Sequence, residues 1–250
     1  MARSGPFNPR RARDPRNTPV AESTSFSAAP GRVGSGPSWQ QHERMASHVV
    51  DKSQWVKITE ANPDHSKWYI ERFRTMAAEG ADLVGEARMI DAMVGRGARI
   101  LDAGCGPGRV GGYLFQQGHD VVGVDVDPEL IAAAEADHPG PVWLVSDLAE
   151  LDLPGDHGIG ERFDAIVSAG NVMTFLAPST RPLVLQRLAA HLAEGGRLVI
   201  GFGAGRDYDF EEFLGHADGA GLIPELLLSS WDLRPFDDSS EFLVAVLVPG

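Results

Sequence analysis

The sequence predicts an α/β fold with a doubly wound, mostly parallel sheet, a C-terminal antiparallel hairpin and an N-terminal helical cap. From residue 99 onward, short apolar runs alternate with helical patterns, which is typical of parallel strands joined by helical crossovers. Two late apolar runs, at 222–231 and 241–248, are joined by a turn-rich loop without a helical pattern. Strands joined in this way run antiparallel. The chain has 250 residues, 43% of them hydrophobic, which is enough for a sizeable core.

Three segments differ in composition. Residues 1–38 are rich in Pro, Gly, Ser and Arg and lack apolar periodicity, so we expect a disordered basic tail. Residues 39–97 form the predicted cap, because they contain two helical patterns, one beginning near Asp64 and one that Asp82 caps. Residues 98–250 form the predicted core domain.

Charge and cysteine content limit the possible partners and the setting of the chain. The net charge is −13, whereas contacts to a nucleic-acid backbone need clustered Lys and Arg, so we expect no nucleic-acid partner. Cys105 is the single cysteine, and its lack of a partner within the chain favours a reducing, cytoplasmic compartment. No apolar run approaches the roughly 20 residues that span a membrane. No spacing of His, Asp or Glu is typical of a metal site.

The first strand of the core leads into a glycine-rich turn. An apolar pair at 100–101 meets Asp102, and glycines then follow at alternate positions, as Gly104, Gly106 and Gly108, before a helical pattern begins. Such a turn directs backbone N–H groups and the positive end of a helix dipole at one place, where polar or anionic ligand groups bind. Glycine lets the backbone approach the ligand closely.

The second predicted strand, at 121–125, ends in an acidic residue. Asp125 is followed by Val126 and then by Asp127 and Pro128, which are typical of a helix N-cap and first turn. A carboxylate about twenty residues beyond a glycine turn accepts hydrogen bonds from ribose hydroxyls in nucleotide-binding proteins. We therefore expect Asp125 to contact a ribose.

The remaining elements continue the alternation of strand and helix. A third strand near 142–145 leads to Asp147 and Leu148, and the loop at 151–160 is expected to lack regular structure over most of its length. The later elements are a strand at 164–169, a helix opened by Ser179 and running through Leu192, a strand at 197–202 and a helix opened by Asp209.

Together these elements resemble the class I S-adenosylmethionine (SAM)-dependent methyltransferases over roughly residues 64–248. The string Asp-x-Gly-x-Gly-x-Gly at 102–108 is similar to the first motif of that family, and the later strands follow in its order and spacing. The resemblance implies a SAM cofactor whose methionine part abuts the glycine turn, whose ribose contacts Asp125 and whose adenine faces Asp147. The implied cofactor-binding residues are Asp102, Gly104, Gly106, Gly108, Asp125, Val126, Asp147, Leu148 and Ala169.

Several functions are consistent with this pattern. A methyltransferase acting on a small molecule is favoured, because the chain is acidic and residues 168–171 lack the Asn/Asp-Pro-Pro-aromatic string of amino-methylating nucleic-acid enzymes. The alternatives are a SAM-binding sensor or binding module without catalysis, and a methyltransferase acting on a macromolecule. A nucleotide-cofactor oxidoreductase is disfavoured, because Pro107 has no N–H and Arg109 stands where a dinucleotide motif needs its third glycine.

The methyl acceptor is expected between the cap and the loops that follow the fourth and fifth strands. Trp55, Trp68 and Tyr69 are the predicted acceptor contacts from the cap, because pockets for small ligands are largely apolar and aromatic. Asn171 is a further candidate, and residues 203–205 could hinge a lid. The alternatives are core packing for the aromatic residues and a turn-forming role for Asn171. No residue is identified as a general base.

Overall fold

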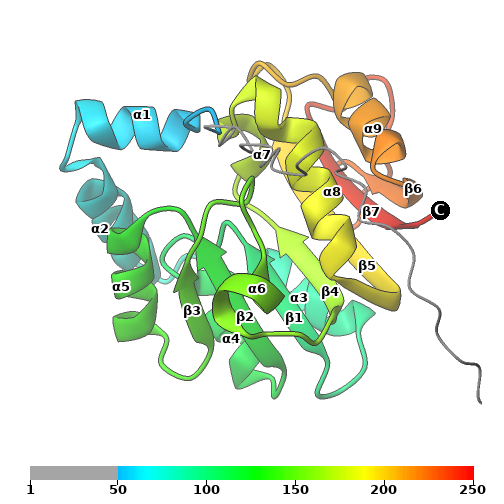
Figure 1. The fold of residues 1–250 in the computed structure, drawn as a ribbon. Coiled ribbons are helices and arrows are strands. Elements are labelled where there is room, and N and C mark those ends of the chain that lie inside the picture. Colours follow the sequence, from blue (N-terminus) through cyan, green and yellow to red (C-terminus); the bar gives the residue numbers. More distant parts are fainter. Residues whose placement is uncertain (1–49) are drawn as a thin grey trace, which may run out of the picture. The chain divides into compact units, whose positions relative to one another are not determined.

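The computed structural model describes residues 50–250 (Figure 1), so the predicted tail and the beginning of the predicted cap lie outside the described residues. The helices are α1 (Gln54–Ala61), α2 (His65–Ala78), α3 (Gly85–Met93), α4 (Arg109–Gln116), α5 (Pro128–Asp137), α6 (Leu153–His157), α7 (Val172–Phe175), α8 (Arg181–His191) and α9 (Phe210–Gly219), with a 3-10 turn at Pro178–Thr180. The strands are β1 (Arg99–Ala103), β2 (Asp120–Asp125), β3 (Val142–Val145), β4 (Phe163–Ser168), β5 (Leu192–Gly203), β6 (Leu222–Leu228) and β7 (Phe242–Pro249).

The strands form one seven-stranded sheet in the order β3-β2-β1-β4-β5-β7-β6. β1 pairs in parallel with β2 and with β4, and β3 and β5 extend the parallel part on either side. β7 pairs antiparallel with both β5 and β6. This order confirms the predicted doubly wound sheet with its C-terminal hairpin. The strand order reverses between β1 and β4, where open α/β sheets leave a crevice for a ligand.

Helices cover both faces of this sheet. On one face, α3 and α4 pack against the strands, and Leu114 of α4 is buried in the same apolar cluster as Ile100 of β1. On the other face, α8 and α9 contribute Leu188 and Phe213 to a cluster that includes Leu198 of β5. Fully buried parallel strands need apolar residues on both faces, which accounts for their nearly continuous apolar runs.

Trp143 of β3 fills a space that three glycines leave open. The ring is buried, and its indole N–H donates to the carbonyl of His138 at 3.0 Å. A Cβ added to Gly108, Gly111 or Gly123 would lie 3.0, 2.9 or 2.2 Å from ring atoms of Trp143. The absence of side chains at these positions therefore lets β2, β3 and α4 pack around one large ring.

α1 and α6 are two of the helices that fall where no helix is predicted. α1 begins after Ser53, whose side chain accepts a hydrogen bond from the N–H of Val56 at 3.2 Å. α6 lies inside the loop that is expected to be irregular, and Asp152 caps it by accepting from the N–H of Gly155 at 3.0 Å. Both helices are short and depend on a side-chain cap, so the apolar periodicity gives little sign of them.

Three predicted helix ends differ from the structure. Leu192 is not part of the helix before it, because α8 ends at His191 and Leu192 pairs with Phe163 as the first residue of β5. Leu192 is apolar because it is buried in the strand, and its spacing in the sequence also fits the next apolar position of the helix. Asp82 does not cap α3; it binds Arg88 with both carboxylate oxygens, and α3 begins three residues later. Ser179 lies in the 3-10 turn before α8.

Candidate functional site

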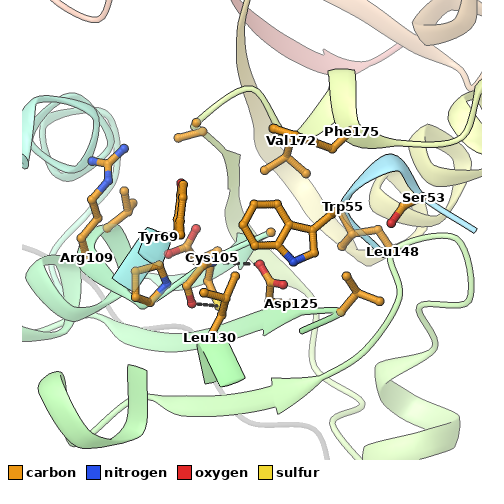
Figure 2. Close-up of a pocket in the computed structure, with 18 of the residues that line it drawn as sticks. Ser53, Trp55, Tyr69, Cys105, Arg109, Asp125, Leu130, Leu148, Val172 and Phe175 are labelled. Atoms are coloured by element: carbon orange, nitrogen blue, oxygen red, sulfur yellow. Dashed lines mark hydrogen bonds between the residues drawn. The ribbon is translucent and has the colours of Figure 1, made fainter. Parts of the chain in front are cut away.

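A pocket lies beside the carboxyl ends of β1, β2 and β4, where the strand order reverses (Figure 2). The space between its walls, with the open solvent at the mouth included, is about 860 Å³. Its walls come from the cap, the glycine turn and the loops that follow β2, β3 and β4. The predicted site residues that line it are Trp55, Tyr69, Asp102, Gly104, Gly106, Asp125, Val126, Asp147, Leu148 and Ala169.

The glycine turn is held against the end of β2. The N–H groups of Gly104 and Cys105 both donate to the carbonyl of Val124 at 2.9 Å. The N–H of Gly106 donates to Oδ2 of Asp125, also at 2.9 Å. Because the neighbouring strand fixes three successive N–H groups, the turn keeps its shape without a ligand.

Gly108 lies behind the pocket wall and does not line the pocket. It occupies the N-cap position of α4 with φ +84°, in the left-handed region that favours glycine. A Cβ at this position would also lie 2.8 Å from the Cβ of Ala134 in α5. Gly108 therefore has a packing role between α4, α5 and β3, and its contact with the cofactor stays a prediction.

Asp125 is a buried carboxylate in the pocket wall. Its Oδ1 accepts from the N–H of Asp127 at 3.0 Å, in addition to the bond that Oδ2 accepts from Gly106. Burial raises the pKa of Asp125 to about 6, against the lowering effect of these two hydrogen bonds. Each carboxylate oxygen has two lone pairs, so the group is able to accept two further donors. A ribose diol supplies that number of hydroxyl groups.

Asp102 connects the pocket to the start of α4. Its Oδ2 accepts from the N–H of Gly111 at 2.8 Å, and the side chain is buried. Burial raises the pKa of Asp102 to about 7. A carboxyl group in this state ionises more readily when a cationic ligand group approaches it.

Asp147 and Leu148 form the wall that follows β3. The Oδ1 of Asp147 accepts from the N–H of Ala149 at 2.8 Å, which fixes a local turn and leaves Oδ2 for another donor. Leu148 is buried and gives an apolar surface to the same wall. Ala169 lies across the pocket at the end of β4.

Two of the three predicted cap aromatics line the pocket. The rings of Trp55 and Tyr69 meet edge to face, with their centroids 5.2 Å apart, and Figure 2 shows both at the pocket wall. Burial raises the pKa of the Tyr69 hydroxyl, so this group is protonated at neutral pH. Trp68 does not line the pocket; its side chain is 57% exposed, because the buried face of α2 is formed by Ser66 and Ile70.

Asn171 also lies outside this pocket and contributes to a neighbouring hollow with residues 203–206. It occupies the N-cap position of α7 with φ +66°, and its Oδ1 accepts from the N–H of Gly203 at 2.8 Å. The N–H of Ala204 donates to the carbonyl of Glu241 at 2.9 Å. Asn171 therefore joins the loop after β4 to β5, and the first two residues of the predicted hinge are hydrogen-bonded to their neighbours.

Arg109, which the sequence pattern did not single out as a site residue, lines the pocket beside Phe73. It forms an ion pair with Glu86 of α3 at 2.6 Å, in which both side chains are only 18% exposed. Its guanidinium also donates to the carbonyl of Leu83 at 2.6 Å and lies 5.6 Å from the ring centroid of Phe73. A cation at the start of a helix is repelled by the positive end of the helix dipole. This unfavourable position is the feature of the sequence that indicates a role for Arg109 beyond helix formation.

Known proteins resemble this chain in both sequence and structure. A family profile described as "Methyltransferase domain" matches residues 100–196. The crystal structure of a TehB-like SAM-dependent methyltransferase from Corynebacterium glutamicum is 53% identical to the chain, with a TM-score of 0.71, and the match covers 76% of this chain and 100% of that chain. The chain belongs to the class I SAM-dependent methyltransferase family. The resemblance seen in the sequence is thereby confirmed, and the cofactor of this family member is S-adenosylmethionine.

Curated relatives of this methyltransferase family member match over shorter segments. The magnesium-protoporphyrin O-methyltransferase of Rhodobacter capsulatus is 33% identical over 142 residues, which are 52% of this chain and 57% of that protein. The ribosomal RNA small subunit methyltransferase C of Chromohalobacter salexigens is 32% identical over 111 residues, or 42% of this chain and 31% of that protein. The chain thus spans about half the length of the first relative and about a third of the second.

The described residues of this family member fit its cofactor. Asp125 retains acceptor capacity for a diol, and Leu148 and Val126 offer apolar surface beside it. A Cβ at Gly106 would point toward the ring of Tyr69, 3.8 Å from Cε1, so the glycine leaves that part of the pocket open. An adenosine with a charged amino-acid tail needs these three kinds of surface: hydroxyl acceptors, an apolar wall and an accessible backbone turn.

The affinity for SAM is expected to fall below about pH 6. Burial raises the pKa of Asp125 to about 6, and its protonation removes a carboxylate oxygen that we expect to accept from the ribose. Binding favours the ionised form, so the dissociation constant should rise by up to about tenfold for each pH unit below this pKa and stay level above it. Calorimetry from about pH 5 to about pH 8 measures this dependence.

Asp125→Asn is the control for this pH dependence. Asp102, with a pKa of about 7, is the other pocket carboxyl group that titrates in the same range. The step near pH 6 should disappear in Asp125→Asn, and any step near pH 7 that remains belongs to Asp102. A variant that keeps the step near pH 6 contradicts the assignment to Asp125.

Proposed function

We propose that the chain transfers the methyl group of SAM to a small-molecule acceptor. When bound, SAM supplies a methyl group that is activated by its sulfonium centre. The chain itself has to hold the donor and the acceptor in line and to exclude water. The observation that carries the proposal is a single pocket in which the glycine turn, the buried Asp125 and the cap aromatics Trp55 and Tyr69 form adjoining walls.

Six of the predicted cofactor contacts have a proposed role in this pocket. Asp125 accepts hydrogen bonds from the ribose hydroxyls, since its two backbone bonds leave lone pairs free. Asp147, with Leu148, faces the adenine, and Oδ2 of Asp147 is available for the amino group. Asp102 braces the glycine turn close to the ammonium group of the methionine part. The turn itself, through Gly104 and Gly106, lies against that part of the cofactor.

The acceptor is proposed to bind beside the cap, where the pocket wall is mostly apolar. Tyr69, Phe73 and Phe175 supply aromatic surface, and the Tyr69 hydroxyl is a polar group among them. Because burial raises its pKa, Tyr69 donates a hydrogen bond at neutral pH and is not available as a general base. Asp102 and Asp125, whose pKa values burial raises to about 7 and about 6, are assigned to the cofactor. We therefore assign no general base among the described lining residues, and an acceptor atom that is unprotonated at neutral pH suits this wall.

Two observations support a small acceptor. The chain is strongly acidic, with a net charge of −13, which disfavours polyanions, and the relative from Rhodobacter capsulatus is named for a small molecule, magnesium-protoporphyrin. A macromolecular acceptor is the second candidate, because another relative is named for ribosomal RNA. We expect neither a nucleic-acid nor a membrane partner.

A cytoplasmic setting belongs to the same proposal. Cys105 is free and buried in the glycine turn, and a reducing compartment keeps such a thiol in this state. Within residues 50–250, no helix combines the length and the apolar content that a membrane crossing requires. Over the same residues, no cluster of three or more His, Cys, Asp or Glu side chains is arranged to hold a metal ion.

The test of the proposed function is a transfer assay with methyl-labelled SAM. The purified chain is incubated with the label and a cell extract, and the products are separated by size, with heat-denatured protein as the control. We expect label in the small-molecule fraction only. Label in RNA, DNA or protein would instead support the macromolecular acceptor. Calorimetric binding of SAM without label above the control would indicate a binding module without catalysis.

A further inference from the structure

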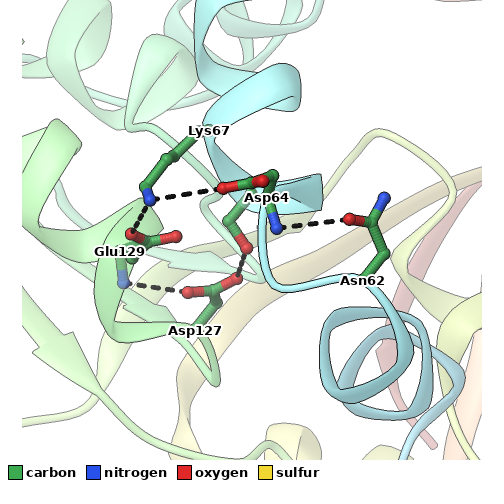
Figure 3. A network of polar contacts seen from close by, with 6 residues as sticks. Asn62, Asp64, Lys67, Asp127 and Glu129 are labelled. Carbon is green, nitrogen blue, oxygen red and sulfur yellow. Dashed lines mark hydrogen bonds and ion pairs between the residues drawn. The ribbon is translucent and has the colours of Figure 1, made fainter.

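One carboxylate, that of Asp127, joins the helical cap to the cofactor pocket. Its Oδ2 accepts the indole N–H of Trp55 in α1 at 2.8 Å and the hydroxyl of Ser66 in α2. Its Oδ1 accepts from the N–H of Glu129 at 2.8 Å, so Asp127 is also the N-cap of α5 (Figure 3). One buried side chain thus connects three helices.

The backbone of the same residue acts on the pocket directly. The N–H of Asp127 donates to Oδ1 of Asp125 at 3.0 Å. Asp127 itself does not line the pocket, whereas Trp55 and Asp125, the two groups that it holds, both do. The side chain therefore fixes one pocket wall and the main chain fixes the carboxylate of another.

The other links between the cap and α5 are of different kinds. Arg74 pairs with Asp137 at 2.9 Å, and Lys67 lies 4.0 Å from Glu129, with both basic side chains well exposed. Exposed pairs of this type contribute little to stability. Trp55 and Ile70 also pack in an apolar cluster with residues of α5, a contact that is not directional. The buried, charge-assisted bonds of Asp127 are stronger and directional.

We propose that Asp127 is a positioning residue for SAM, which holds Trp55 in the pocket wall and Asp125 in its ribose-facing orientation. The inference rests on the proposed role of this pocket in cofactor binding. Through Asp127, the turn that binds the ribose determines the position of the cap as well as that of the strand ends. Loss of the Asp127 contacts should therefore speed the release of SAM.

Two substitutions separate this role from the capping of α5. Asp127→Asn keeps a side-chain oxygen for the N–H of Glu129, since Asn is as good an N-cap as Asp. Its amide NH₂ then faces the indole N–H of Trp55, which is only a donor, so the bond to Trp55 is lost, whereas the hydroxyl of Ser66 is able to accept from the amide. Trp55→Phe removes the indole N–H and keeps an aromatic wall. Asp152→Asn is the matched control, because Asp152 caps α6 in the same way and does not line the pocket.

The experiment measures the release of methyl-labelled SAM from the pre-loaded protein after an excess of unlabelled SAM is added. Asp127→Asn and Trp55→Phe should raise the dissociation rate constant by about tenfold or more, and Asp152→Asn should leave it unchanged. Amide hydrogen exchange of residues 54–61 in the cofactor-free protein should be faster in Asp127→Asn than in the wild-type protein.

The possible results distinguish this inference from the proposed function. Dissociation rate constants within about twofold of wild type in both variants overturn the positioning role, even if their melting temperatures fall. A wild-type protein that retains no labelled SAM overturns the proposed cofactor site together with the inference. Release that is faster in the variants than in the wild type, with unchanged release in Asp152→Asn, supports both.

Discussion

Replacing Asp125 with alanine is expected to weaken SAM binding by about 10- to 150-fold and to leave the fold intact. A carboxylate that accepts ribose hydroxyl bonds contributes about 1.5–3 kcal/mol to binding, which corresponds to this loss of affinity. The carboxylate is buried with a raised pKa, so its removal also takes away an unfavourable buried charge. Calorimetry measures the affinity, and circular dichroism measures the retention of secondary structure.

Asp120→Ala is the control for this variant. Asp120 begins the same strand, at the end far from the pocket, and its side chain pairs with Arg99 at 2.9 Å on the protein surface. We expect its affinity for SAM to equal that of the wild-type protein. An unchanged affinity in Asp125→Ala, or tighter binding of NAD than of SAM by the wild-type protein, would contradict the assigned role.

Gly108→Ala should lower the free energy of unfolding by about 2–5 kcal/mol. An alanine at φ +84° costs about 1–2 kcal/mol in the left-handed region. Its Cβ would also lie 2.8 Å from Ala134 and 3.0 Å from the ring of Trp143, and such overpacking costs about 1–3 kcal/mol more. Urea unfolding at equilibrium measures the difference from the wild-type protein.

Gly118→Ala separates the two contributions. Gly118 follows the other end of the same helix with φ +90°, and no atom lies within 4 Å of a Cβ at that position. Gly118→Ala should therefore lower the free energy of unfolding only by the conformational cost, about 1–2 kcal/mol. Equal losses in the two variants would show that close packing at Gly108 contributes nothing.

The sheet and the polar strand ends are predictable from the sequence because their signals are local. Each parallel strand carries its own apolar run, and the residue that follows it, such as Asp125 or Asp147, lies at the carboxyl edge of the sheet in any doubly wound fold. The antiparallel hairpin follows from the short connection between two apolar runs. Neither inference needs knowledge of how the helices pack.

The cap is less predictable, because its contacts are set by packing between distant segments. Trp55 and Trp68 are equally aromatic, but only Trp55 lines the pocket, since Asp127 holds its indole and Ile70 turns the other face of α2 inward. Gly108 belongs to a ligand-binding motif by sequence, yet the neighbours that exclude a side chain there are Ala134 and Trp143, which lie much later in the sequence. No local sequence pattern predicts either contact.

The space around Trp143 has a consequence for how this sequence is able to vary. Three glycines leave room for the same ring: Gly108 and Gly111 at the start of α4, and Gly123 in β2. A larger residue at any one of them collides with the tryptophan, and a smaller residue at position 143 leaves a cavity that all three border. The effects of substitutions at these four positions are therefore not additive, since each depends on the other three. Amino-acid substitutions at this part of the fold therefore have to occur in pairs, in which a smaller side chain at position 143 and a larger neighbour arise together.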